Sequence, residues 1–350
     1  MNGKKITIHA GLHKTETSSI QAALFDSRFL LLENGILYPK FGGDRWKNHS
    51  VPLSLLFMDE ENSGYPAVRN IFPDKNLQVA ASEKIFQDFL LELIRYGEKN
   101  ILLSAEDFST FKKNELGRLK DFFSNLCDCE FEIVVYVREP IAYAISDAQE
   151  LVRAGVKTIG EAIKIGNLQR AKARISNLID VFGAESVKVF DYDGLDSAGG
   201  DVVRHFFTAV GLPFQAPVKE VGRANVSSTI ERILVLSAIK KLDPSLLARV
   251  SSDLPHDGER TALGDKSRQV IWDACKSDVD FLRNEFGIDY KYNDVSTPSL
   301  SLTVLDSCVE IAMRHQGTLS RDEIIDAIVE DVKDVFPELI YDIVSLGNRK

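Results

Sequence analysis

The sequence predicts an α/β protein with a parallel β-sheet flanked by helices on both faces. Short apolar runs rich in β-branched residues alternate with longer stretches at helical spacing through the first two thirds of the chain. Strands that are separated by helices favour right-handed crossovers and a parallel sheet. After about Gly211 the strand signal fades and the patterns are helical, apart from a polar linker expected over residues 287–301. We therefore predict one large α/β domain over residues 1–295 and a C-terminal helical extension, packed on it or appended to it, over residues 296–350.

Each expected element follows from its own residues. The strands are the apolar runs that end at polar or turn residues, and Pro39 stops the second of them. They are expected over residues 4–10, 35–39, 101–104, 131–137 and 186–192. Helical periodicity predicts helices over residues 17–32, 53–57, 80–98, 113–126 and 141–153, further helical pattern to residue 182, and helices within 228–242, 266–286 and 321–336.

Composition limits the function classes. The net charge of −10 argues against a general nucleic-acid or anionic-membrane binder, so no nucleic-acid partner is expected. No apolar run reaches the length of a membrane span, and "MNGKKITIHAG" has no signal-peptide core, which favours a cytoplasmic protein. The spacing of Cys127 and Cys129 matches no zinc pattern, so we expect free thiols and no metal.

The segment "GLHKTETSS" (residues 11–19) follows the first expected strand and opens the first expected helix. In open α/β sheets ligands bind at the carboxyl ends of strands, where a helix N-terminus offers free N–H groups to an anion. Gly11 suits the turn, Lys14 is a cation, and hydroxyls follow at Thr15, Thr17 and Ser18. The spacing is not that of a Walker A loop, because no glycine directly precedes the lysine.

Two further segments carry groups that bind anions. In "IVVYVREPIAYAISDAQ" a strand ends at Arg138, and Ser146 follows eight residues later. A guanidinium can hold a phosphate through two parallel hydrogen bonds, and a hydroxyl adds another donor. The third segment, "VGRANVSS", contains Arg223, Asn225 and Ser227, of which the last two fit a helix N-cap equally well.

Together these segments resemble the sulfotransferases that use 3′-phosphoadenosine-5′-phosphosulfate (PAPS), over about residues 4–295. Bacterial and carbohydrate-modifying members carry a K-T-G-T-T-like run after the first strand, a strand ending in Arg with a later Ser, and a downstream N-x-S segment. The resemblance implies a P-loop NTPase-like fold, PAPS as donor, adenosine 3′,5′-bisphosphate as product and no metal. It assigns His13, Lys14, Thr15, Glu16, Thr17 and Ser18 to the 5′-phosphate, and Arg138, Ser146, Arg223, Asn225 and Ser227 to the 3′-phosphate or ribose.

Glu16 departs from the family pattern, which has glycine at this position. Glycine lets the backbone approach a phosphate and take a positive φ, whereas a carboxylate repels phosphate. Three alternatives are open. The Glu16 side chain points away from the ligand while its backbone N–H binds the phosphate, or the carboxylate stabilises the first turn of the helix. In the third alternative, the site has lost its affinity for PAPS. We favour the first two alternatives, because Lys14, Arg138 and Ser146 are all present.

Sulfuryl transfer resembles phosphoryl transfer, in which positioning and cations supply most of the catalysis. Lys14 is expected to stabilise charge on the leaving phosphate. The acceptor hydroxyl needs a base, for which family members use Glu or His. Glu106, at the end of the strand 101–104, is the first candidate, and His49 is the second candidate or orients the acceptor.

The acceptor is expected to be a hydroxyl of a carbohydrate or glycolipid, since Arg45, Trp46 and His49 would suit a sugar. A small secondary metabolite is the alternative acceptor. Two other classes stay open, a P-loop nucleotide kinase and a nucleotide-binding regulator of sulfotransferase descent. The missing Walker A spacing speaks against the kinase, and Glu16 is the feature that would mark the regulator. The sequence leaves the oligomeric state open.

Overall fold

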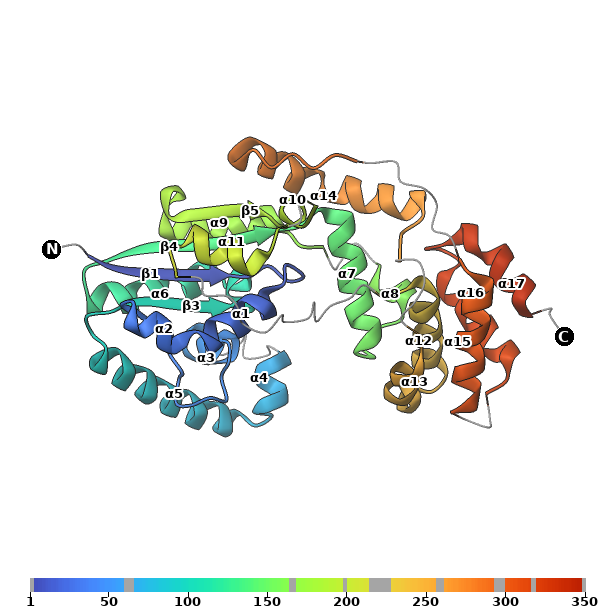
Figure 1. Cartoon of the computed structure of the whole chain (residues 1–350), viewed down its shortest axis with the longest axis horizontal. Coiled ribbons are helices and arrows are strands. Elements are labelled where there is room, and N and C mark those ends of the chain that lie inside the picture. The colour runs from blue at the N-terminus through green and yellow to red at the C-terminus, as the bar shows by residue number, and fades with distance from the viewer. Residues whose placement is uncertain are drawn as a thin grey trace. The chain divides into compact units, whose positions relative to one another are not determined.

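The computed structural model describes residues 3–59, 66–163, 168–197, 200–213, 228–255, 261–292, 300–315 and 319–347 (Figure 1). The chain divides into two compact units. Unit 1 consists of Met1–Arg138, Arg170–Ala224 and Asn284–Ile288, and unit 2 of Glu139–Gln169, Asn225–Arg283 and Asp289–Lys350. Each unit has a hydrophobic core of its own and is described separately.

Unit 1 is built on a five-stranded parallel sheet in the order β2-β3-β1-β4-β5, so the predicted α/β class is confirmed. The strands are β1 (Lys4–Ala10), β2 (Ile36–Leu37), β3 (Asn100–Ala105), β4 (Cys129–Val137) and β5 (Val187–Asp191). The central β1 pairs with β3 on one side and β4 on the other. Since all strands are parallel, the segments that follow β1, β3 and β4 leave the same edge of the sheet.

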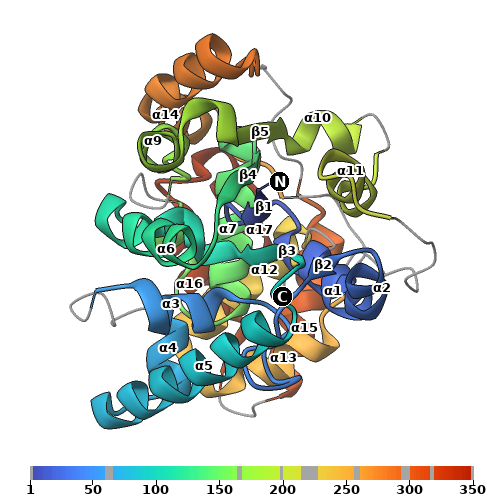
Figure 2. The same ribbon diagram turned by 90° about the vertical axis from the view of Figure 1, so that its left-hand side faces the viewer.

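Helices cover both faces of this sheet, as the sequence predicts (Figure 2). On one face lie α1 (Thr17–Asp26), α2 (Arg28–Glu33) and α11 (Val202–Ala209), whose apolar residues form one core with Leu102, Val134 and Tyr136. On the other lie α6 (Lys113–Leu126) and α9 (Ala171–Phe182), where the ring of Phe131 in β4 contacts Phe123 edge-on and Phe182 at a tilt. Burial of each such side chain stabilises the fold by about 1.5–3 kcal/mol.

Two helices of unit 1 have other bounds than the sequence predicts. The single helix expected over 17–32 is two helices, because the chain bends at Ser27 between α1 and α2. The helix expected from residue 80 starts earlier, since Asp74 caps its N-terminus by accepting from the N–H groups of Asn76 and Leu77. The other elements of unit 1 are α3 (Ser50–Phe57), α4 (Pro66–Ile71), α5 (Lys75–Arg95), η2 (Glu106–Thr110), η4 (Ala184–Ser186) and α10 (Tyr192–Ser197).

Unit 2 is helical within its described residues and is organised around α12 (Ile230–Leu242), in which every residue from Ile230 to Ile239 is buried. Around it lie α7 (Pro140–Arg153), α8 (Ile159–Ala162), α15 (Leu302–Arg314) and α16 (Arg321–Val332). The division into units therefore differs from the predicted boundary at 295/296, because α15 and α16 share a core with α12 and α7. The other elements are η5 (Pro244–Leu246), α13 (Leu247–Asp253), α14 (Asp265–Phe286), η6 (Pro337–Leu339) and α17 (Ile340–Gly347).

Within the described ranges, no helix carries an apolar stretch long enough to span a bilayer. All four cysteines are free thiols, of which Cys275 and Cys308 are buried in the core of unit 2.

Candidate active site

The loop between β1 and α1 turns sharply at Gly11. A Cβ atom at Gly11 would lie 2.6 Å from the Thr17 hydroxyl oxygen, so only glycine allows the loop to close on the first turn of α1. Thr15 and Thr17 are buried, and the Thr15 hydroxyl donates to the Leu12 carbonyl at 2.7 Å. These two side chains therefore hold the loop from inside, and the phosphate contact of the Thr17 hydroxyl stays a prediction. Ser18, by contrast, is exposed.

The loop presents main-chain donors at its outer side. Within the described residues, no hydrogen bond is formed by the N–H groups of Thr15, Glu16, Thr17 and Ser18, whereas those of Ser19 and Ile20 donate to the Glu16 carbonyl. Lys14 and Glu16 have φ angles of 68° and 54°, and Thr15 between them is not in the positive-φ region. Such alternation forms concave anion-binding nests, and the dipole of α1 adds partial positive charge.

Glu16 stands at the N-cap of α1 in the left-handed conformation and makes no side-chain cap hydrogen bond. Glycine adopts this conformation without strain, whereas for a residue with a Cβ it costs about 1–2 kcal/mol. Glu16 therefore keeps the backbone geometry of the loop despite its side chain. The backbone N–H of Glu16 is one of the free donors described above.

Arg138 follows β4 and reaches across to this loop. Its Nη1 atom donates to the Lys14 carbonyl at 3.0 Å, and its Nε atom lies 3.3 Å from a carboxylate oxygen of Asp193 in α10. The guanidinium also lies over the ring of Tyr192, 5.2 Å from the ring centre. The sequence predicts that Arg138 binds a phosphate. The structure adds that its guanidinium links the segments after β4 and β5 to the loop between β1 and α1.

His13 and Glu106 are brought together from the ends of β1 and β3. The Nδ1 atom of His13 lies 2.8 Å from Oε1 of Glu106, and its Nε2 atom lies 3.7 Å from Oδ1 of Asp107. Burial lowers the pKa of His13, but the hydrogen bond to Glu106 and the charges of Glu106 and Asp107 outweigh burial and the opposing charge of Arg174, so the pKa is raised above 6.5. The backbone N–H of Glu106 donates to the Ser50 hydroxyl at 3.0 Å.

His49 is fully buried, contrary to the loop position that its polar surroundings suggest. Its Nε2 atom lies 2.9 Å from the Pro39 carbonyl, and its Nδ1 atom accepts from the Ser104 N–H at 3.1 Å. Burial lowers the pKa of His49 to about 3, so the ring is neutral, with the proton on Nε2. Neither ring nitrogen is open to a substrate, and the structure therefore does not support the base role predicted for His49.

The other predicted site residues are placed as follows. Ser146 is half-buried on α7 in unit 2, and Pro140 is the first residue of that helix, as expected. Arg223, Asn225 and Ser227 lie outside the described residues. Arg45 and Trp46 lie with Phe72 in one cluster, in which the Arg45 guanidinium is 4.7 Å from the centre of the Trp46 ring.

Two carboxylates of the site were missed by reasoning from the sequence. Asp107 directly follows Glu106, and Asp193 follows β5 by two residues. Both come directly after strands, at the sheet edge where ligands bind, and this position is the signal that would have found them.

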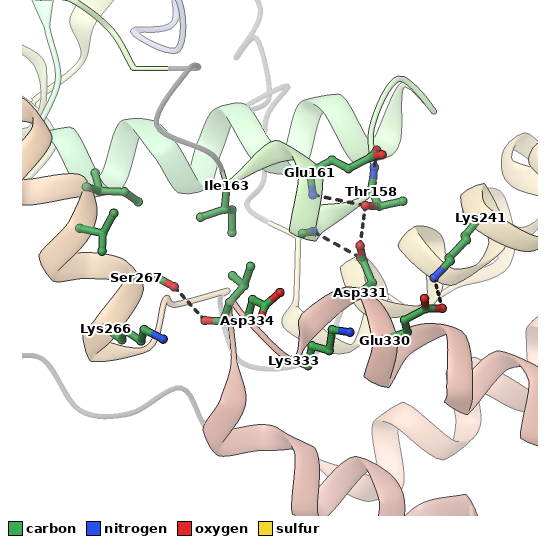
Figure 3. A pocket seen from close by; sticks show the side chains of 14 residues that line it. Thr158, Glu161, Ile163, Lys241, Lys266, Ser267, Glu330, Asp331, Lys333 and Asp334 are labelled. Carbon is green, nitrogen blue, oxygen red and sulfur yellow. Dashed lines mark hydrogen bonds and ion pairs between the residues drawn. The ribbon is translucent and has the colours of Figure 1, made fainter.

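A pocket of about 440 Å³ lies in unit 2 and is lined by residues of α8, α12, α14 and α16 (Figure 3). On one side Asp331 accepts hydrogen bonds from the hydroxyls of Thr158 and Ser237, both at 2.5 Å, and Lys241 pairs with Glu330. These groups join the helices of unit 2. We therefore regard the pocket as part of its packing rather than as a second site.

No model of a known protein family matches the chain, and no curated protein matches it. Three of the solved structures that are similar to this chain are sulfotransferases or sulfotransferase domains. A sulfotransferase from Alicyclobacillus acidocaldarius is 17% identical, with a TM-score of 0.45, over 82% of this chain and 97% of that one. The sulfotransferase domain of the Synechococcus PCC 7002 olefin synthase is 11% identical, with a TM-score of 0.37, over 83% of this chain and 97% of that domain.

A third neighbour is the sulfotransferase domain from the curacin biosynthetic pathway, which is 12% identical, with a TM-score of 0.35, over 79% of this chain and 98% of that domain. Similarity at this level says nothing about the donor or acceptor of this chain. Both are therefore argued below from its own residues.

The left-handed conformation of Glu16 predicts that glycine can replace it without loss of stability. Glu16→Gly relieves about 1–2 kcal/mol of backbone strain and loses about 0.4–1 kcal/mol to the greater freedom of the unfolded chain. We expect the free energy of unfolding in urea to stay unchanged or to rise by up to about 1.5 kcal/mol. Glu16→Val, which is β-branched, is expected to lower it. A loss of stability in the glycine variant as large as in the valine variant would contradict this conformation.

The buried His49 predicts a pH-dependent loss of stability. The unfolded chain binds a proton at His49 near pH 6.5, whereas the folded chain does so only near pH 3. The free energy of unfolding therefore falls as the pH drops below 6.5, by up to about 1.4 kcal/mol per pH unit from this group. In urea unfolding at pH 7, 6 and 5, we expect a shallower fall in His49→Asn than in the wild type.

Equal pH slopes in the wild type and His49→Asn would contradict this assignment. If the variant does not fold, NMR titration of the His49 ring in the wild type gives the same answer. We expect this ring to stay neutral down to pH 5.

Proposed function

We propose that the protein is a sulfotransferase that moves the sulfuryl group from PAPS to an acceptor hydroxyl by in-line transfer. The observation that carries this proposal is the set of free N–H groups of Thr15 to Ser18, at the helix N-terminus that follows the central strand. An anion is what such a cradle binds best. Lys14 lies in the same loop, so main-chain donors and a cationic side chain belong to the segment that would bind the phosphosulfate group.

The donor-side residues have distinct tasks in this proposal. The N–H groups bind the 5′-phosphate, and Lys14 neutralises the charge that develops on the leaving phosphate oxygen. Arg138 donates to the Lys14 carbonyl and so supports the loop, and it stays a predicted ligand of the 3′-phosphate. Ser146, Arg223, Asn225 and Ser227 stay predicted ligands of the 3′-phosphate or ribose.

The acceptor-side residues are His13 and Glu106. The hydroxyl must lose a proton as it attacks, and this pair is the proton-accepting unit next to the loop. A carbohydrate or glycolipid hydroxyl is our first candidate acceptor, because Trp46 and the Arg45 guanidinium, which lies over its ring, combine an aromatic and a polar group of the kind that binds sugars. A hydroxyl of a small secondary metabolite is the alternative.

Nucleotide binding tests the proposal directly. Adenosine 3′,5′-bisphosphate is expected to raise the thermal unfolding midpoint in a concentration-dependent way, and ATP with Mg²⁺ is not. Lys14→Ala is expected to weaken bisphosphate binding about 10- to 100-fold in calorimetry, because it removes a charge-assisted contact of about 1.5–3 kcal/mol. Lys113→Ala on α6 removes the same charge elsewhere in unit 1 and should leave the affinity unchanged.

The other outcomes decide among the rival functions. A preference for ATP with Mg²⁺ would indicate a nucleotide kinase. Tight bisphosphate binding without transfer of labelled sulfate to any sugar, glycolipid or phenolic acceptor of a broad panel would indicate a regulator. No binding of either nucleotide would overturn the proposal.

A further inference from the structure

Within the pair formed by His13 and Glu106, we propose that the Nε2 atom of His13 accepts the proton of the acceptor hydroxyl, and that Glu106 and Asp107 are positioning residues. This inference rests on the sulfuryl transfer proposed above. It revises the sequence prediction, in which Glu106 is the base and His13 only a main-chain ligand of the phosphate.

The hydrogen bond of His13 fixes which of its nitrogens is basic. An ionised carboxylate can only accept, so the proton of the neutral ring lies on Nδ1, 2.8 Å from Oε1 of Glu106. The Nε2 atom then carries the lone pair. Within the described residues Nε2 makes no hydrogen bond, since the Asp107 oxygen at 3.7 Å lies beyond hydrogen-bond distance. About a third of the His13 side chain is exposed, so a hydroxyl can reach it.

The charges around the ring favour its protonated form after the transfer. Glu106 and Asp107 face His13 from η2, Arg174 faces it from α9 with the opposite effect, and Lys14 is its chain neighbour. The Asp107 side chain is only 4% exposed, which keeps its charge close to the ring and poorly screened by water. The carboxylates dominate, so an imidazolium at this position is stabilised rather than penalised.

Glu106 is also held in a fixed position. It begins η2 directly after β3, and its N–H donates to the Ser50 hydroxyl. Ser109 of the same turn donates to the Gly11 carbonyl at 3.1 Å. The turn that carries both carboxylates is therefore bonded to the loop that carries His13, so the ring orientation is set by two elements rather than by a single contact.

The proposed step balances without a further reactant. The acceptor oxygen forms a bond to sulfur as the bond from sulfur to the 5′-phosphate oxygen breaks, and its electron pair leaves with the phosphate. The acceptor proton moves to Nε2 of His13, which gives an imidazolium between two carboxylates. This proton is returned to solvent after the sulfated product leaves.

The ring state can be measured on the full chain without any acceptor. In ¹⁵N NMR of the imidazole, we expect His13 to carry its proton on Nδ1 at high pH and to titrate above pH 6.5. Glu106→Gln keeps an oxygen that accepts from Nδ1 but removes the charge, so the midpoint should fall while the tautomer stays. A proton on Nε2 in the neutral ring, or a midpoint that Glu106→Gln does not move, would overturn the proposal.

Kinetics separate this inference from the proposed function. For transfer of labelled sulfate to an acceptor from the panel, or to water where none reacts, we expect His13→Asn to slow turnover about 10²- to 10⁴-fold. Bisphosphate affinity should not change. The acid limb of kcat/KM should follow the His13 midpoint and move to lower pH in Glu106→Gln.

The matched control is His315→Asn, whose ring pairs with Asp253 at the same 2.8 Å in unit 2 and should not affect the rate. Full turnover in His13→Asn together with a loss of turnover in Glu106→Gln would return the base role to Glu106. Absence of bisphosphate binding in the wild type would instead overturn the proposed function, and would leave the NMR result on the ring standing.

Discussion

The central position of β1 in a fully parallel sheet is the constraint on which the site depends. Because β1 lies between β3 and β4, the segments after these three strands leave the same edge and adjoin one another. His13, Glu106 and Arg138 come from those three segments. The segments are far apart in the sequence, since Lys14 and Arg138, which are hydrogen-bonded, are separated by 124 residues. A parallel sheet with another strand order would place them farther apart along that edge.

The loop after β1 combines two requirements that conflict in most sequences. It must free its main-chain donors, and it must hold its shape without them. Buried contacts resolve this conflict, since Thr15, Thr17 and Gly11 pack on the inner side and Arg138 binds the Lys14 carbonyl. The outer side then carries the main-chain N–H donors and Glu16 in its left-handed conformation. The surrounding contacts offset the backbone strain of this conformation.

Much of the fold and the placement of the site follow from local patterns. The five strands and the positions of Lys14, Glu106 and Arg138 at strand ends were predictable, because apolar runs and the crossover rule determine them. The burial of His49 was not, since it depends on the rings of Tyr38 and Phe41, 4.2 and 5.0 Å away, which a polar loop sequence does not indicate. The contact of His13 with Glu106 spans 93 residues and depends on how η2 turns. The helices after residue 295 join an earlier core for the same reason, because sequence distance does not reveal which apolar faces meet.

The central claim is that the main chain of Thr15 to Ser18 holds the 5′-phosphate, and hydrogen–deuterium exchange tests it most directly. With adenosine 3′,5′-bisphosphate added, exchange of these four amides should slow markedly, because donors that now bond only to solvent acquire an acceptor. The amides of α6, on the face of the sheet away from α1, should exchange as before. Tight bisphosphate binding without slower exchange in the segment from Thr15 to Ser18 would contradict the account.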